Sequence, residues 1–258
     1  MSRTKALQAG GEKLSFVFGE TLKKIKPGVS LAEVNQKAED LLNKIGLKPS
    51  FKTVRNYQWA ACLNINEGVV HGVPNERIIT RGDLVSLDMG LIFAGWHVDM
   101  AYTVEINPPA GGERLKAKSL EATKFLQAGK MALAQAIKAA RAGNYVGDIS
   151  VAIQTVIEKA GYQVVSKLAG HGVGKSLHEL PNVPGVLRGK KEDTPRLEEG
   201  MALALEVIYT KGRGGIKVGP DGWTISTQDG KIAALFEKTV LVGQNQAEEL
   251  TPFVWKNV

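Results

Sequence analysis

The chain has 258 residues, a formal net charge of +7 and one cysteine, Cys62. This length suits one large domain or two small ones, and a single cysteine excludes both an intrachain disulfide and a cysteine-rich metal cluster. The longest apolar runs are shorter than the roughly 20 residues of a membrane-spanning helix, and the N-terminus has no apolar signal core, so we expect a cytoplasmic protein without a membrane segment.

Two predicted helices open the first half of the chain. Apolar residues recur at helical spacing from Lys13 to Ile25. Ser30 and Glu33 have the spacing of a capping box, which predicts a second helix running to about Ile45. Strand-like segments follow at 60–66, 84–93 and 96–106.

The second half repeats this order of helices followed by strands. Helices are predicted at 113–141 and 147–160, and strands at 163–168, 201–209, 222–227 and 232–242. We therefore expect a single domain over residues 1–258, built from two similar halves at about 12–107 and 113–245.

Short motifs also recur in the same order in the two halves. A carboxylate lies six residues after a glycine at both Asp88 and Glu206, and a His-Gly pair occurs at both His71 and His171. Chance similarity between two α/β halves is the alternative explanation. If the repeat is real, a pseudo-two-fold axis would bring these groups to a shared centre.

Several carboxylates interrupt or end apolar, strand-like runs, namely Asp88, Glu206 and Glu237. Burying one lone carboxylate costs several kcal/mol, so buried charges are usually paired or bound to a metal. Salt bridges on edge strands remain the alternative for the two glutamates. The pattern otherwise predicts a metal centre.

A fourth carboxylate, Asp99, can be placed by hairpin geometry. Ala94 and Gly95 suit a two-residue turn between strands, in which Gly90 would lie opposite Asp99. Asp88 and Asp99 would then share one sheet face as diagonal neighbours roughly 7–8 Å apart, and could converge on ions between them. Two solvent-facing aspartates on an amphipathic hairpin are the alternative.

His171 lies between glycines that leave its ring accessible, and it could add a nitrogen to the four carboxylates. Such an oxygen-rich set suits a pair of divalent ions (Co, Mn, Fe or Zn) better than one structural zinc site. Two ions roughly 3.5–4 Å apart can share a water molecule and lower its pKa. The sequence therefore predicts hydrolytic chemistry.

The remaining histidines differ in what they offer. His71 and His178 lie near glycine or proline turns and could donate hydrogen bonds to a substrate amide or a tetrahedral intermediate, although a purely structural role is the alternative for each. His97 lies in the hairpin, and we expect it to point away from the two aspartates and to have no role.

These motifs together identify a family. From about Leu14 to Val242 the chain resembles type I methionine aminopeptidases of the bacterial kind. The order and spacing of the motifs carry the resemblance: His71–Pro74, Gly82–Asp88, Trp96–Asp99, Gly170–Gly174, His178–Pro181, Glu206, Asp221–Trp223 and Phe236–Glu237.

The resemblance implies a pita-bread fold, an α/β (α+β) architecture in which a central antiparallel sheet is flanked by helices with internal pseudo-two-fold symmetry. It also implies removal of the initiator methionine from nascent chains whose second residue is small. Two divalent ions would be bound by Asp88, Asp99, His171, Glu206 and Glu237. Glu206 would act as general base, His71 and His178 would contact the substrate, and the methionine pocket would draw on Phe51, Tyr57, Cys62, Leu177 and Trp223.

Three positions depart from the family pattern. Leu177 stands where an aromatic residue is usual, Val207 where proline is usual, and Lys238 where histidine is frequent. These changes leave the expected metal ligands intact. They bear instead on the shape of the methionine pocket.

Other functions stay open on sequence grounds. A second enzyme of the same fold would cut Xaa-Pro bonds, and a non-catalytic pita-bread protein could associate with ribosomes through a basic surface. The net charge alone supports a nucleic-acid-binding domain. We expect a monomer whose partner is the N-terminal methionine of a nascent peptide, with ribosome association as a further expectation.

Overall fold

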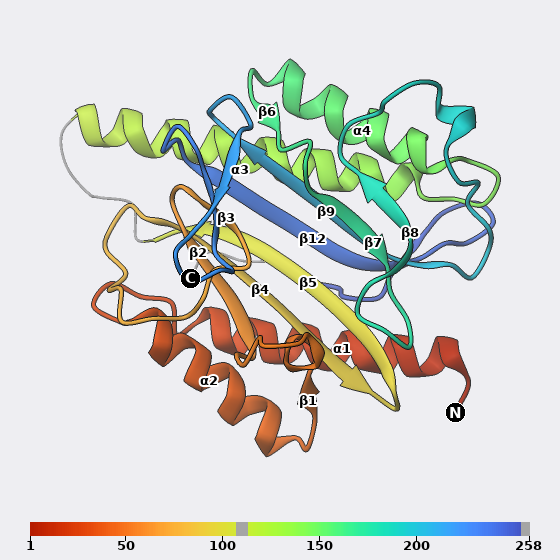
Figure 1. Ribbon diagram of the computed structural model, residues 1–258, viewed down its shortest axis with the longest axis horizontal. Helices are drawn as coiled ribbons and strands as arrows, with labels where there is room; N and C mark the ends of the chain where they lie inside the picture. The colour runs from red at the N-terminus through yellow and green to blue at the C-terminus, as the bar shows by residue number, and fades with distance from the viewer. Residues whose placement is uncertain (107–112, 254–258) are drawn as a thin grey trace.

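The computed structural model describes residues 1–106 and 113–253. Within these residues a ten-stranded sheet runs through the centre, and its long strands lie in the order β4 (Leu84–Phe93), β5 (Trp96–Glu105), β12 (Ala233–Leu241) and β9 (Ala202–Thr210), each antiparallel to its neighbour (Figure 1). Short strands complete it: β1 (Lys48–Pro49) and β2 (Ala61–Ile65) beside β4, β6 (Gln163–Val164) and β7 (Ala169–Gly172) beside β9, β8 (Glu179–Pro184) beside β7, and β13 (Glu248–Glu249) beside β12.

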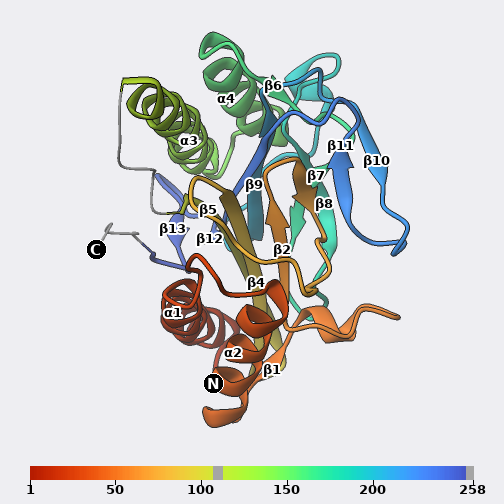
Figure 2. The ribbon, with the colours of Figure 1, turned by 90° about the vertical axis from the view of Figure 1, so that its left-hand side faces the viewer.

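The helices and a second, smaller sheet lie on opposite sides of this sheet (Figure 2). On one side are α1 (Arg3–Leu22) and α3 (Glu113–Ala139), with α2 (Leu31–Lys44) and α4 (Val146–Lys159) next to them. The small sheet on the other side has the order β10 (Ile216–Val218), β11 (Ile225–Thr227), β3 (Gly68–Val70). Two 3-10 turns, η1 (Phe51–Thr53) and η2 (Lys191–Asp193), lie in connections. In the described part of the chain, no helix has the length and apolarity that crossing a bilayer requires.

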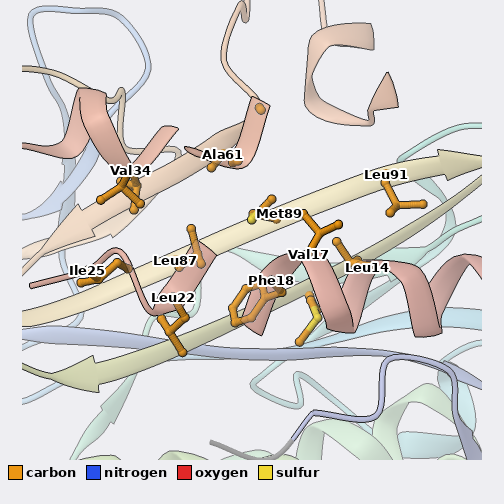
Figure 3. Close-up of a cluster of buried hydrophobic side chains, with 14 of the residues drawn as sticks. Leu14, Val17, Phe18, Leu22, Ile25, Val34, Ala61, Leu87, Met89 and Leu91 are labelled. Atoms are coloured by element: carbon orange, nitrogen blue, oxygen red, sulfur yellow. The ribbon is translucent and has the colours of Figure 1, made fainter. Parts of the chain in front are cut away.

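The alternation of side chains along β4 decides which face of the sheet is polar. Leu87 and Met89 belong with Phe18 of α1 to one fully buried apolar cluster (Figure 3). Because successive side chains of a strand point to opposite faces, Asp88 and Gly90 must point away from the helices. The apolar packing of α1 thereby turns the polar residues of β4 toward the small sheet.

Two local predictions are confirmed in detail. The Ser30 hydroxyl accepts a hydrogen bond from the backbone N–H of Glu33 at 3.2 Å, and the Glu33 carboxylate accepts one from the N–H of Ser30 at 2.9 Å. Ala94 and Gly95 form the hairpin turn with φ of 49° and 77°, and Gly90 lies opposite Asp99. The capping box and the hairpin register were therefore readable from the sequence.

The predicted start of the first helix was wrong. Helix α1 begins at Arg3 rather than Lys13, and the side chain of Ser2 caps it by accepting a hydrogen bond from the N–H of Lys5. Gly10 and Gly11, which interrupt the apolar spacing, lie buried inside the helix. A Cβ on Gly11 would lie 1.7 Å from the carbonyl oxygen of Leu250, so this glycine allows the C-terminal segment to pack against the helix.

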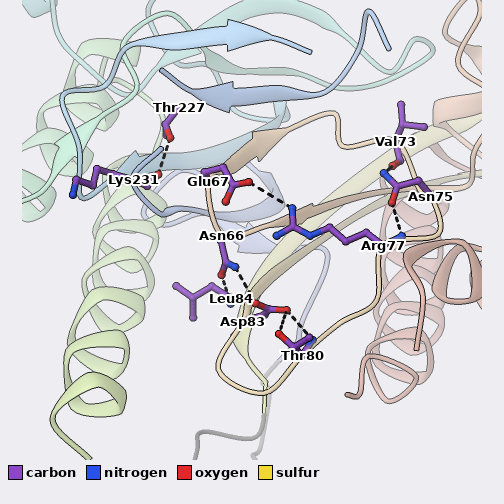
Figure 4. A network of polar contacts seen from close by, with 10 residues as sticks. All are labelled: Asn66, Glu67, Val73, Asn75, Arg77, Thr80, Asp83, Leu84, Thr227 and Lys231. Carbon is purple, nitrogen blue, oxygen red and sulfur yellow. Dashed lines mark hydrogen bonds and ion pairs between the residues drawn. The ribbon is translucent and has the colours of Figure 1, made fainter. Parts of the chain in front are cut away.

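Polar contacts anchor the loops on either side of β3 (Figure 4). The Asn66 amide donates to Asp83 Oδ1 at 2.9 Å and accepts from the N–H of Leu84 at 3.0 Å. Beyond the strand, the Asn75 amide donates to the carbonyl of Val73 at 3.2 Å. His71 lies between these anchors with φ of 55°, in the left-handed region that non-glycine residues rarely adopt.

Candidate metal centre and active site

Three of the predicted carboxylates lie in one row across the sheet. Asp88 of β4 is the cross-strand partner of Ala101, Ala101 is the partner of Glu237 on β12, and Glu237 is the partner of Glu206 on β9. Cross-strand partners point to the same face. Asp88, Glu237 and Glu206 therefore all point away from the helices, and the small side chain of Ala101 leaves space between them.

The other two predicted donors lie in the next row on the same face. Asp99 is opposite Gly90, and His171 on β7 is opposite Ala204, two residues from Glu206 on β9. A Cβ on Gly90 would come within 3.2 Å of Asp99 Oδ1, so glycine leaves room for that carboxylate. Two adjacent rows of one sheet thus bring together donors that are far apart in the sequence.

The distances within this group would allow several of its members to bind one metal ion. Asp99, His171 and Glu237 each offer a ligand atom, and these atoms all lie within 4.8 Å of one another. His171 Nε2 is 3.6 Å from Glu206 Oε1. Asp88 Oδ1 and Glu237 Oε1 are buried and accept no hydrogen bond from any described residue. Buried acceptors of this kind are costly unless they are satisfied, and a divalent cation would satisfy them.

The electrostatics of the metal-free site agree with this interpretation. Burial raises the pKa of Asp99 to about 7. Burial, reinforced by the neighbouring Asp99, raises the pKa of Glu206 to about 8 and also raises the pKa of Glu237 and of Asp88. Without a cation, burial and mutual repulsion disfavour the ionised form of these carboxylates. A bound cation would instead favour the ionised form and lower their pKa values.

His171 is held in the form that can bind a metal. Its Nδ1 is 2.9 Å from the carbonyl oxygen of Gly172, and because a carbonyl can only accept, Nδ1 carries the proton. Nε2 then presents its lone pair toward Glu206. Burial lowers the pKa of His171 to about 4, so the ring is neutral at pH 7. A histidine oriented by a carbonyl through its other nitrogen is typical of metal sites.

An apolar pocket adjoins the carboxylates. Phe51, Cys62 and Leu177 are buried around Tyr57, whose ring makes edge contacts with Phe51 and with Trp223 at centroid distances of 6.3 and 5.2 Å. The Tyr57 hydroxyl donates to the carbonyl of Ala61 at 3.1 Å, so its polar end is satisfied. The pocket therefore offers apolar surface to a bound group.

One cavity joins these features. The empty space within it, including the part that is open to solvent, is about 560 Å³. All twelve predicted site residues line it, together with Val54 and Val70: Phe51, Tyr57, Cys62, His71, Asp88, Asp99, His171, Leu177, His178, Glu206, Trp223 and Glu237. His71 and His178 are solvent-exposed at its edge, and the His178 ring is 4.4 Å from that of His171.

Comparison with known proteins gives the family. Residues 5–244 match the model of "Metallopeptidase family M24". A methionine aminopeptidase of Clostridium acetobutylicum is 39% identical over 240 residues, which cover 91% of this chain and 92% of that protein. The chain belongs to metallopeptidase family M24. Membership of this family implies a divalent metal, and the buried Asp, His and Glu cluster is the candidate site for it.

Comparison with solved structures extends the similarity to the fold. The crystal structure of methionine aminopeptidase from Thermotoga maritima has a TM-score of 0.87 at 34% identity, with 96% of each chain covered. This similarity confirms the expected pita-bread fold. A prolidase from Pyrococcus furiosus has a TM-score of 0.73 at 22% identity, with 98% of this chain and 64% of that chain covered, and this likeness concerns the fold alone.

At this cavity, the structure corrects the prediction for one histidine and adds two lining residues that were not predicted. His97 was expected to point away from the aspartates, but it lies two residues from Asp99 on a regular strand and so shares its face. Its ring is buried, with Nδ1 3.0 Å from Ser50 Oγ, and it is absent from the residues found to line the cavity. Val54 and Val70 were missed. Val70 directly precedes His71, which is a usable signal, but Val54 lies in a turn without periodicity.

Proposed function

We propose that this protein is a methionine aminopeptidase that removes the initiator methionine from chains whose second residue is small. The observation that carries the proposal is the adjacency of two features in one cavity: a cluster of buried carboxylates with a neutral histidine, and an apolar pocket.

In the proposed site two divalent ions, chosen among Co, Mn, Fe and Zn by cellular supply, are held by Asp88, Asp99, His171, Glu206 and Glu237. When bound, such ions would lower the pKa of a water molecule at the site and polarise the scissile carbonyl. Glu206 acts as general base: it takes a proton from the attacking water and returns it to the leaving amine. Its position beside His171 and opposite Glu237 supports this role.

Side chains at the edge of the cavity bind the substrate in this proposal. His71 and His178 donate hydrogen bonds to the peptide and to the oxyanion of the tetrahedral intermediate, which their exposed positions beside the carboxylates support. Phe51, Tyr57, Cys62, Leu177 and Trp223 enclose the methionine side chain.

The wider biology is part of the same proposal. We place the protein in the cytoplasm as a monomer of one domain with two similar halves, where its substrates are nascent peptides. The net charge of +7 supports a transient contact with the ribosome, because a basic surface is attracted to RNA phosphates. Sucrose-gradient sedimentation with ribosomes at two salt concentrations tests that contact.

Hydrolysis of short peptides tests the enzymatic proposal. With added Co²⁺ or Mn²⁺ we expect methionine release from Met-Ala-Ser, little from Met-Leu-Ser, and none after the Asp99→Ala substitution, which removes a proposed ligand. The fold likeness to a prolidase makes Xaa-Pro cleavage the rival activity. Cleavage of Ala-Pro peptides with inert Met-Ala-Ser would replace the proposal by that rival, and inertness of the metal-loaded protein toward both would indicate a non-catalytic protein.

A further inference from the structure

Two threonine hydroxyls join the middle strands of the sheet. Strands β5 and β12 pair directly at Ala101 with Glu237 and at Met100 with Lys238. On one side of this pairing, Thr239 Oγ1 donates to the carbonyl of Asp99 at 2.7 Å and accepts from the N–H of Asp99 at 2.8 Å. Both backbone groups of Asp99 are therefore occupied by one hydroxyl.

The opposite side of the pairing has the same arrangement around a different residue. Thr103 Oγ1 donates to the carbonyl of Leu235 at 2.8 Å and accepts from its N–H at 2.9 Å. Thr103, Thr239 and both of their partners are buried. The two bridges are equivalent in chemistry and burial, but one holds an aspartate of the candidate metal centre and the other holds a leucine.

The Thr239 bridge is itself supported from the end of the chain. The N–H of Thr239 donates to Thr251 Oγ1 at 3.1 Å, and the N–H of Leu250 donates to the carbonyl of Thr239 at 2.9 Å. The Leu250 carbonyl in turn packs against Gly11 of α1. Contacts from both ends of the chain thus converge on the backbone of Asp99.

We infer that Thr239 is a positioning residue for the metal centre: its hydroxyl fixes the backbone of Asp99 and thereby the place of the Asp99 carboxylate. Hydrogen bonds to both sides of one Cα restrict rotation about φ and ψ, and the Cα–Cβ direction follows from these angles. Removing a residue that orients a metal ligand through a hydrogen bond typically weakens metal binding by about 10- to 100-fold. The inference rests on the proposed function, because Asp99 binds an ion only if the metal centre exists.

Metal affinity of matched variants tests the inference without using activity. Thr239→Val keeps the shape and removes the hydroxyl, Thr239→Ser keeps the hydroxyl, and Thr103→Val removes the equivalent bridge together with its 2.7 Å contact to Ser86. Each metal-free protein is titrated with Co²⁺ by calorimetry, with the visible absorption of bound Co²⁺ as a second readout and with urea unfolding measured in parallel.

We expect Thr239→Val to weaken Co²⁺ binding by about tenfold or more and to alter the absorption spectrum. Thr239→Ser and Thr103→Val should both bind like the wild type, although Thr103→Val loses comparable stability in urea. Unchanged affinity in Thr239→Val, or an equal loss in Thr103→Val, would overturn the positioning role while leaving the metal centre in place.

Two further results separate the inference from its premise. Wild-type protein that binds no Co²⁺ would overturn the metal centre and the inference with it. If Thr239→Val does not fold, Thr251→Val replaces it, since it removes the acceptor of the Thr239 N–H. A weaker but measurable loss of Co²⁺ affinity would then support the inference, and wild-type affinity would contradict it.

Discussion

At the scale of single residues, the cavity combines groups that no apolar core would retain. Asp88 and Glu237 each bury an oxygen that accepts no hydrogen bond from the described residues, and on β4 the neighbours Leu87 and Met89, which point to the opposite face, are fully buried. A cation bound there would offset the free energy that burying these oxygens costs. The side chains at the exposed edge serve a different purpose, because they can approach a substrate without holding the ions.

We therefore expect different results for a substitution at the edge of the cavity and for a substitution of a proposed metal ligand. His178→Ala should lower kcat by roughly 100-fold, the usual contribution of a group that donates a hydrogen bond or proton in the transition state, and should leave the metal content unchanged. Asp99→Ala should lose metal as well as activity. Metal analysis of the purified proteins beside steady-state kinetics checks both. Loss of metal in His178→Ala in proportion to its activity would assign the histidine to the metal instead.

At the scale of elements, long periodic segments and tight turns were predictable from the sequence, whereas some short strands, such as β7 and β8, were not. The Ala94-Gly95 turn set the register of β4 and β5, and with it the common face of Asp88 and Asp99. Strand β7 has only four residues, two of them glycines, so its position depends on pairing with β8 and β9. His171 was therefore identified by its neighbours in the sequence, while its place in the second row required the structure.

The true start of α1 was also not predictable from the sequence, because Gly10 and Gly11 interrupt the apolar spacing of the helix. The packing of Gly11 leads to a prediction. In Gly11→Ala the new methyl group would meet the Leu250 carbonyl, so we expect a loss of about 3 kcal/mol in the free energy of unfolding. Gly19→Ala is the control on the same helix. Its Cβ would lie 3.4 Å from Phe253, an ordinary contact, and the better helix propensity of alanine should add up to about 1 kcal/mol.

Urea unfolding followed by circular dichroism measures both variants. A Gly11→Ala as stable as the wild type would contradict the packing role of Gly11. A Gly19→Ala that loses as much stability as Gly11→Ala would show that the loss does not depend on the contact with Leu250.

At the scale of the whole molecule, the charge state of the cavity links metal binding to stability. The folded, metal-free protein holds protons on Asp99 and Glu206 up to pKa values of about 7 and about 8, whereas the unfolded chain releases them near pH 4. The folded state therefore binds more protons than the unfolded state in this interval, and stability falls as pH rises. His171, with its pKa lowered to about 4, acts in the opposite direction, but only below about pH 6.5.

The interval above pH 6.5 is therefore the informative one. Between pH 6.5 and 8.5 we expect the Tm of the metal-free protein to fall by about 3 °C or more, a shift that corresponds to about 1 kcal/mol in a chain of this size. With saturating Mn²⁺ the fall should disappear, because the bound cation keeps the carboxylates ionised. Differential scanning calorimetry with and without chelator measures it. A metal-free Tm that rises over this interval would contradict the buried carboxylate cluster.

The packing of Leu250 against Gly11 also has a consequence for how far a mutation in α1 can act. The segment at Leu250 and Thr251 packs on this helix and donates and accepts hydrogen bonds with the backbone of Thr239. A side chain at position 11 that displaces this segment would therefore disturb the strand beside Asp99 as well as the helix. The helical face of the sheet and the cavity on its other face are mechanically linked through these two residues.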